Sequence, residues 1–234
     1  MGEISGVSVK AAYRNTLISE DPPESKGNIK LSTDIILTKI LTLPGIILGL
    51  SLHEFAHAWV SDKLGDPTPK RDGRITVNPL AHIDWIGLLC LIVAGFGWGK
   101  PVRIDPRYYK KPRRDEFLVS IAGVVMNLIL ACILAVPVRL MISNLYHASG
   151  IMYDVFLVFY YAVSINIVLM IFNLIPCPPL DGWNIVTQIF KLDRYSWWYK
   201  IYQYGTWILL ALIVFNVTSL IISPLLNIIM GILI

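Results

Sequence analysis

One apolar segment places the strongest limit on how this chain can fold. Residues 35–60 carry only two charged side chains, Lys39 and Glu54. A helix of this length can cross a lipid bilayer. His53 and His57 flank Glu54 in the pattern H-E-x-x-H near the far end of the segment. Ionisable residues are costly inside a membrane unless they have a function, so the segment predicts a membrane-spanning helix that carries chemistry.

The spacing of the two histidines suits a metal ion. Positions i and i+4 share one face of a helix, so His53 and His57 can reach the same ion. Glu54 lies beside them, where its carboxylate can accept a proton from a water molecule. The alternative is a pair of buried histidines hydrogen-bonded to neighbouring helices, and the glutamate between them makes it the weaker interpretation.

The composition places the whole chain in the membrane class. Of its 234 residues 55% are hydrophobic and 15% are charged, and the mean hydropathy is +0.61. Soluble domains carry about 25% charged residues. The cysteines Cys90, Cys132 and Cys177 lie in or beside apolar segments without a spaced framework, which predicts free thiols.

We therefore expect an all-α polytopic membrane protein with a single intramembrane domain. Residues 1–30 are polar, lack the apolar core of a cleavable signal peptide and form an N-terminal arm. Residues 31–234 form the domain. Four spans are predicted at about residues 35–61, 117–141, 151–174 and 204–222.

Two shorter elements are expected between the first and second spans. Residues 83–98 are apolar but too few to cross as a helix, and Gly95 and Gly97 would weaken its end, so a re-entrant or interfacial segment is predicted. Residues 74–77 have strand character between turn signals, which predicts half of a small β-hairpin at the membrane surface. An extended substrate could add to such an edge strand.

The charge distribution predicts an orientation. Residues 99–115 hold seven Lys and Arg against two Asp. Cytoplasmic loops are rich in Lys and Arg, so this loop is expected in the cytoplasm, against anionic lipid headgroups and not nucleic acid. The histidine motif then lies near the cytoplasmic side. Four Lys and Arg before residue 31 oppose this orientation mildly.

A catalytic zinc site needs a third protein ligand. Such sites usually have three protein ligands and an open fourth position. Asp181 follows a proline-rich turn, residues 176–179, on the side where the histidines are expected. The other aspartates lie in polar loops or, for Asp154, at the opposite end of the third span. Asp181 is therefore favoured, with Cys177 and His82 as weaker alternatives.

Two motifs together resemble a known family. The H-E-x-x-H motif and an N-x-x-P stretch leading to L-D-G, with Asn173 eight positions before Asp181, are similar to the site-2 protease family of intramembrane zinc metalloproteases. The resemblance covers roughly residues 44–184 and fits the compact prokaryotic-type branch without a PDZ or CBS domain. Further similar stretches lie at residues 65–67, 73–79, 82–84 and 95–102.

The resemblance implies a site and an activity. It implies His53, His57 and Asp181 as ligands of one Zn²⁺ per chain, Glu54 as general base and acid, and Asn173 as an aid to the substrate or tetrahedral intermediate. It also implies cleavage of membrane proteins or peptides in or near a transmembrane segment, in a multi-pass protein of a prokaryotic cell membrane. A helical substrate has to open locally, so small or helix-breaking residues are expected near its cut site.

The sequence departs from the family pattern at one position, and the role of Asn127 and the function each have alternatives. Members of the family often have A-G-P before an asparagine in the middle span, whereas this chain has A-G-V before Asn127. Asn127 is either a helix-packing residue or a substrate contact. The competing functions are a proteolytically inactive membrane scaffold or chaperone, against which the intact motif speaks, and a metal transporter, for which the spans offer few polar residues.

Overall fold

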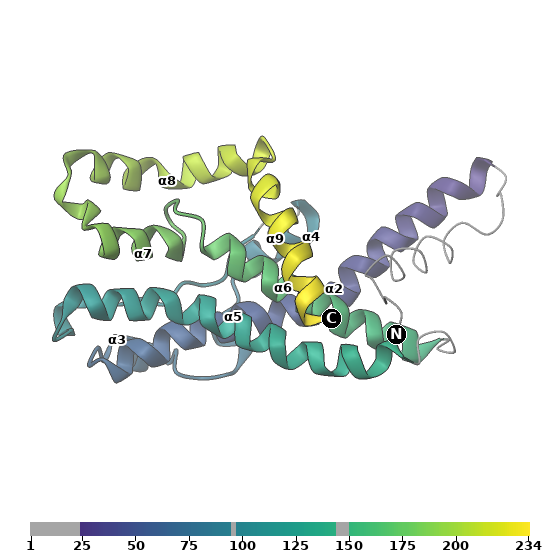
Figure 1. The fold of residues 1–234 in the computed structure, drawn as a ribbon, viewed down its shortest axis with the longest axis horizontal. Coiled ribbons are helices and arrows are strands. Elements are labelled where there is room, and N and C mark those ends of the chain that lie inside the picture. Colours follow the sequence, from purple (N-terminus) through teal and green to yellow (C-terminus); the bar gives the residue numbers. More distant parts are fainter. Residues whose placement is uncertain (1–23, 95–96, 144–149) are drawn as a thin grey trace, which may run out of the picture. The chain divides into compact units, whose positions relative to one another are not determined.

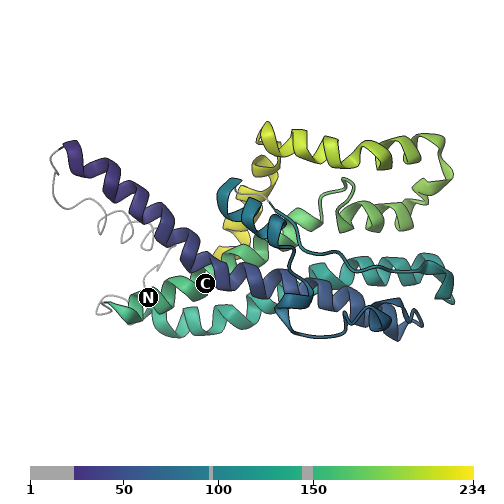
Figure 2. The ribbon, with the colours of Figure 1, turned by 180° about the vertical axis from the view of Figure 1, so that it is seen from behind.

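The computed structural model describes residues 24–94, 97–143 and 150–234 (Figure 1, Figure 2). The chain divides into two compact units, Met1–Leu41 and Thr42–Ile234, and every residue expected in the site belongs to the second. The predicted arm falls mostly outside the described residues. Residues 24–30 are the first part of a long helix.

The described residues are helical and contain no strand. Three of the helices, over Leu37–Lys63, Pro112–Ile142 and Ile151–Asn173, are long and apolar enough to cross a membrane, and a bent pair adds a fourth candidate. The structure thus confirms an all-helical protein with three to four candidate spans. The elements are α2 (Glu24–Lys63), α3 (Thr68–Arg71), η1 (Pro79–Ala81), α4 (Trp85–Ala94), η2 (Pro106–Tyr108), α5 (Pro112–Ile142), α6 (Ile151–Asn173), α7 (Asp181–Phe190), η4 (Leu192–Arg194), α8 (Ser196–Val214) and α9 (Val217–Leu233).

The segment predicted as one span at residues 204–222 is broken. Helices α8 and α9 meet at an angle of 69°. Between them Asn216 has a φ of 58°, in the left-handed region. Asparagine adopts this region more readily than most residues, so it can end α8 and redirect the chain.

Two contacts link this bent pair to α5 near the two ends of that helix. Arg113 at the start of α5 pairs with Asp193 just before α8, at 2.8 Å. Arg139 near the other end of α5 donates hydrogen bonds to the carbonyls of Leu233 (2.6 Å) and Ile232 (2.7 Å) at the end of α9. The pair therefore connects the two ends of α5, as one broken span would, and does not return to the side where it begins.

The predicted β-hairpin is wrong. Residues 74–77 form an irregular segment. Hydrogen bonds from side chains, and not from a partner strand, hold the chain here. The His82 imidazole donates from Nε2 to the Thr76 carbonyl (2.8 Å), and the Arg74 guanidinium donates to the Lys100 carbonyl. Because these side chains occupy the carbonyls, no backbone ladder is needed to satisfy them.

The segment predicted as re-entrant or interfacial contains one short helix, and its place in the membrane stays a prediction. Helix α4 has 10 residues, too few for a span. The chain after it folds back on its first turn, because a Cβ atom on Gly87 would lie 2.1 Å from the Trp98 carbonyl oxygen. Ile86, Leu89 and Val93 leave large apolar side chains exposed on this helix.

Small residues let α2 approach α6 closely. A Cβ atom on Gly45 would lie 2.6 Å from the Ala162 Cα atom, and one on Gly49 would lie 2.7 Å from the Asn166 Oδ1 atom. The two glycines are four residues apart, the spacing at which small residues form helix–helix interfaces in membranes. Helix α6 also packs with α5 around an apolar core that includes Val138 and Ile167, and apolar side chains of α9 pack against this core.

A buried carboxylate anchors the basic loop at residues 99–115 to the end of α2. Asp66 is fully buried and accepts hydrogen bonds from the Ser61 hydroxyl (2.9 Å) and from the backbone N–H groups of Thr68 (2.9 Å) and Asp105 (2.8 Å). Burial would raise the pKa of the Asp66 carboxyl, but the donated hydrogen bonds outweigh it and hold the pKa below its usual value.

We expect Asp66→Asn to lower the thermal midpoint in detergent and to cost about 1–3 kcal/mol of stability, because a buried acceptor is lost. The contribution of Asp66 is full above the unfolded-state pKa near 3.8. It is lost as the pH falls through the lower pKa of the folded state, so wild type and variant should converge in acid. Asp62→Asn, at a partly exposed position, is the control. A constant difference at every pH would contradict the prediction.

Candidate metal centre

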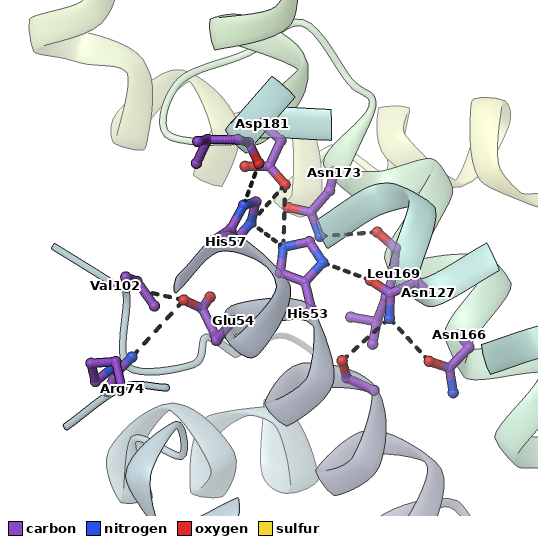
Figure 3. Close-up of polar contacts among 12 residues, drawn as sticks. His53, Glu54, His57, Arg74, Val102, Asn127, Asn166, Leu169, Asn173 and Asp181 are labelled. Atoms are coloured by element: carbon purple, nitrogen blue, oxygen red, sulfur yellow. Dashed lines mark hydrogen bonds and ion pairs between the residues drawn. The ribbon is translucent and has the colours of Figure 1, made fainter. Parts of the chain in front are cut away.

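The structure brings the predicted ligands together. His53 and His57 lie on one face of α2 and are 5% and 7% exposed. Their Nε2 atoms lie 3.2 Å and 3.3 Å from the Asp181 Oδ2 atom at the start of α7 (Figure 3). Ligand atoms of all three residues lie within 4.8 Å of one another, and no other cluster of His, Cys, Asp and Glu with such geometry occurs among the described residues.

The turn before α7 presents Asp181 to the histidines. After α6 ends, the chain tightens through hydrogen bonds from the Cys177 N–H to the Ile175 carbonyl (2.8 Å) and from the Leu180 N–H to the Cys177 carbonyl (2.9 Å). A Cβ atom on Gly182 would lie 2.5 Å from the Ile175 carbonyl oxygen. Only glycine therefore fits after Asp181, which explains the L-D-G sequence in physical terms.

Helix α5 orients both imidazoles. The Nδ1 atom of His53 lies 2.6 Å from the Asn127 Oδ1 atom, and the Nδ1 atom of His57 lies 2.7 Å from the Val119 carbonyl oxygen. Both oxygens accept, so each Nδ1 carries a proton, and in the neutral imidazole this leaves Nε2 unprotonated. Each Nε2 then presents a lone pair toward Asp181. Partners of this kind commonly fix the tautomer of metal-binding histidines.

Asn127 connects three helices. Its Nδ2 donates to the Asn166 Oδ1 atom on α6 (3.0 Å) and to the Gly49 carbonyl on α2 (3.3 Å), while its Oδ1 accepts from His53. Asn127 is completely buried. The sequence left Asn127 as either a helix-packing residue or a substrate contact. The structure shows the helix-packing contacts, together with a contact that orients His53.

The arrangement fits a zinc ion by its chemistry. When each imidazole is neutral and keeps its proton on Nδ1, as metal binding requires, the two Nε2 atoms, 3.0 Å apart, both present lone pairs. The buried Oδ2 of Asp181 has no hydrogen-bond donor. Three electron-pair donors that face one another need a cation between them, and two imidazoles with one carboxylate are ordinary zinc ligands.

Glu54 lies next to the cluster and is held by the chain that follows α4. Its Oε2 atom accepts a hydrogen bond from the Val102 N–H (3.0 Å) and lies 4.0 Å from the Arg74 guanidinium (Figure 3). Its side chain is 15% exposed. The predicted base is thus a partly buried carboxylate with two fixed neighbours.

The other predicted site residues make contacts outside the cluster. Asn173 is the last residue of α6, and its Nδ2 donates to the Leu169 carbonyl of its own helix (2.9 Å). His82 is buried and bonded to backbone, and Cys177 is buried beside the Gly205 carbonyl. Neither belongs to the metal-type cluster. The role of Asn173 stays a prediction.

Gly123 is a site residue that sequence reasoning missed. A Cβ atom there would lie 2.5 Å from the His53 Cε1 atom and 2.5 Å from the His57 Nε2 atom. It shares a face of α5 with Val119 and Asn127, at intervals of four residues. A glycine in the middle of an apolar span, four positions before a buried asparagine, was the available signal.

Comparison with known proteins agrees with this site. A model of "Peptidase family M50" matches residues 137–215, which include Asp181. A Bacillus subtilis protein named "Putative zinc metalloprotease YwhC" is 40% identical over 185 residues, which are 78% of this chain and 84% of that protein. The chain belongs to peptidase family M50.

More distant relatives carry the same kind of name. Proteins named "Putative zinc metalloprotease Rip2" from Mycolicibacterium smegmatis and Mycobacterium tuberculosis are 32% and 30% identical, over 62% of this chain and 55% of their own length. No solved structure matches the chain. As an M50 member the protein is a zinc metalloprotease of the site-2 type and an integral membrane protein.

We expect Gly123→Ala to weaken zinc binding about 10- to 100-fold, because the added methyl group displaces both imidazoles. Competition with a chromophoric chelator in detergent measures the affinity. Gly231→Ala on α9 is the matched control, since no atom lies within 4 Å of a Cβ atom there. Equal affinities for the two variants would contradict the role given to Gly123.

Asn127→Leu should lower zinc affinity by about 10- to 100-fold, because the His53 Nδ1–H loses its acceptor. Asn127→Asp keeps an oxygen for His53 while losing the donor to Asn166, so it should retain more affinity than Asn127→Leu. The same chelator competition compares the two. Asn127 has no orienting role if the leucine variant binds zinc as tightly as wild type.

Proposed function

We propose that the protein is an intramembrane endopeptidase that cuts its substrates in or near a transmembrane segment. The observation that carries the proposal is the place of the His53–His57–Asp181 cluster, whose two histidines lie on a helix long and apolar enough to span a bilayer. The proposed zinc ligands are these three residues. A protease whose metal site lies on a membrane-spanning helix would meet peptide bonds of membrane-embedded chains.

The ion, when bound, would acidify a water molecule and polarise the substrate carbonyl. Glu54 is the proposed general base, which takes the proton from the attacking water and returns it to the leaving amine. The Val102 N–H supports this assignment, because it fixes one carboxylate oxygen, Oε2, and the other oxygen remains to accept the proton. His53 and His57 keep their ring orientation through α5 during the reaction.

Asn173 is the proposed aid to the substrate carbonyl. It ends α6, eight residues before Asp181, so the same connection carries both residues. Its amide donates to the Leu169 carbonyl in this structure. Donation to a substrate oxygen requires the amide to leave that bond, at the cost of about one ordinary hydrogen bond.

The proposed substrates are transmembrane segments that can open locally. A helical peptide bond is shielded by its own hydrogen bonds, so small or helix-breaking residues near the cut site favour cleavage. We further propose a prokaryotic cell membrane with the site near the cytoplasmic side. The basic loop at residues 99–115 and the bacterial relatives support this orientation and origin.

We expect Glu54→Gln to abolish cleavage and to keep about one zinc per chain, because Glu54 is a base and not a ligand. The probe is a fluorophore–quencher peptide set in detergent, each with an apolar helix of about 20 residues, either uninterrupted or carrying a central Gly-Pro pair. Cleavage of the interrupted peptides alone supports the substrate proposal. Full activity of the glutamine variant would exclude Glu54 as the base.

Asp181→Ala should reduce the zinc content sharply, since it removes one of three proposed ligands. Elemental analysis of freshly purified protein measures the loss. Asp193→Ala, at an exposed position paired with Arg113, is the matched control and should keep its zinc. Undiminished zinc in Asp181→Ala would show that another side chain completes the site.

A further inference from the structure

Arg74 is a buried cation that the proposed chemistry does not yet use. It is 5% exposed, although it lies in the irregular segment between α3 and η1. Arginine is rarely buried to this degree without a partner, because removing its charge from water is costly. Its place in the fold therefore calls for a specific anion or a set of acceptors.

The guanidinium joins two pieces of chain beside Glu54. It donates to the Ala81 carbonyl at the end of η1 and to the Lys100 carbonyl in the segment after α4. Its Nη2 atom also lies 4.0 Å from the Glu54 Oε2 atom. The rigid fork of an arginine can hold several oxygens at fixed angles, which a lysine cannot do.

The Lys100 contact extends to the base itself. Two residues after Lys100, the Val102 N–H donates to the Glu54 Oε2 atom (3.0 Å). The Lys100 N–H donates to the His82 carbonyl (2.8 Å), so this short segment is tied down on both sides. Fixing the Lys100 carbonyl therefore fixes the one backbone donor that orients the Glu54 carboxylate.

Among the charged groups around Arg74, Glu54 is the anion whose charge Arg74 compensates. Asp72 also lies near Arg74, but its two carboxylate oxygens bind Arg103 at 2.7 Å and 2.8 Å. His82 is the other basic group nearby. Burial and the Arg74 cation lower the pKa of His82, so it stays neutral. Arg74 thus supplies the positive charge beside the partly buried Glu54.

We propose that Arg74 is a positioning residue for Glu54, which holds the carboxylate in its working orientation both by its charge and through the Lys100–Val102 segment. The inference rests on the proposed function, because it takes Glu54 as the base. It also separates Arg74 from the metal ligands, which it does not contact. A residue that only braced the loop would affect folding and zinc content but not the catalytic step selectively.

The test compares Arg74→Gln and Arg74→Lys with Arg107→Gln, a matched arginine in the same loop region that is exposed and paired with Asp105. The readouts are kcat and KM on a cleaved probe peptide, zinc content and thermal midpoint. Arg74→Gln should keep its zinc and its KM while kcat falls about 100-fold, as for a misplaced catalytic group. Arg74→Lys keeps the charge but not the fork and should recover part of kcat.

The outcomes separate this inference from the proposed function. An active Glu54→Gln variant would overturn the proposed base. An inactive Glu54→Gln variant beside a folded Arg74→Gln variant with wild-type kcat would overturn only the role of Arg74. Loss of zinc and of the thermal midpoint in proportion to kcat would also overturn it, because that pattern belongs to a structural brace.

A stability cycle keeps the inference testable if Arg74→Gln does not fold. Arg74→Lys, Glu54→Gln and the double variant are melted in detergent, and their shifts in thermal midpoint are compared. Residues that act on each other give shifts that do not add, whereas a brace that ignores Glu54 gives additive shifts. Non-additive shifts support the inference and additive shifts overturn it.

Discussion

The two hydrogen bonds that the imidazoles donate to oxygens of α5 are the contacts on which the rest of the site depends. An imidazole inside an apolar helix needs a partner for its N–H, and α5 provides one oxygen for His53 and one for His57. These bonds place each proton on Nδ1 and direct each Nε2 toward Asp181. Without them the ring orientation and the tautomer would both be free, and the three ligands would not converge.

Close helix packing makes those bonds possible. Gly123 lets α5 approach the histidine face of α2, and Gly45 and Gly49, eight and four positions before His53, let α6 approach the same helix. Asn127 then reaches both neighbours with one amide. In a bilayer there is no hydrophobic gain from bringing helices together, so small residues and buried amides provide the attraction. The same residues therefore stabilise the fold and build the proposed metal centre.

The chain between α3 and α5 provides the neighbours of the Glu54 carboxylate. Its Thr76, Ala81 and Lys100 carbonyls accept hydrogen bonds from His82 and Arg74, and its Val102 N–H donates to the Glu54 carboxylate. Irregular backbone is tolerated near a membrane when protein groups meet its hydrogen-bonding needs. This arrangement leaves the carboxylate fixed but still accessible beside the metal ligands.

The sequence by itself determined the features that arise within one helix or one short motif. The apolar runs established the membrane class and the helical fold, the four-residue spacing placed His53 and His57 on one face, and the L-D-G turn indicated Asp181. Tertiary structure decided what depends on two segments meeting. It replaced the expected hairpin by side-chain contacts and broke the last span at Asn216. It also left no room for a side chain at Gly123, through distances that no local pattern records.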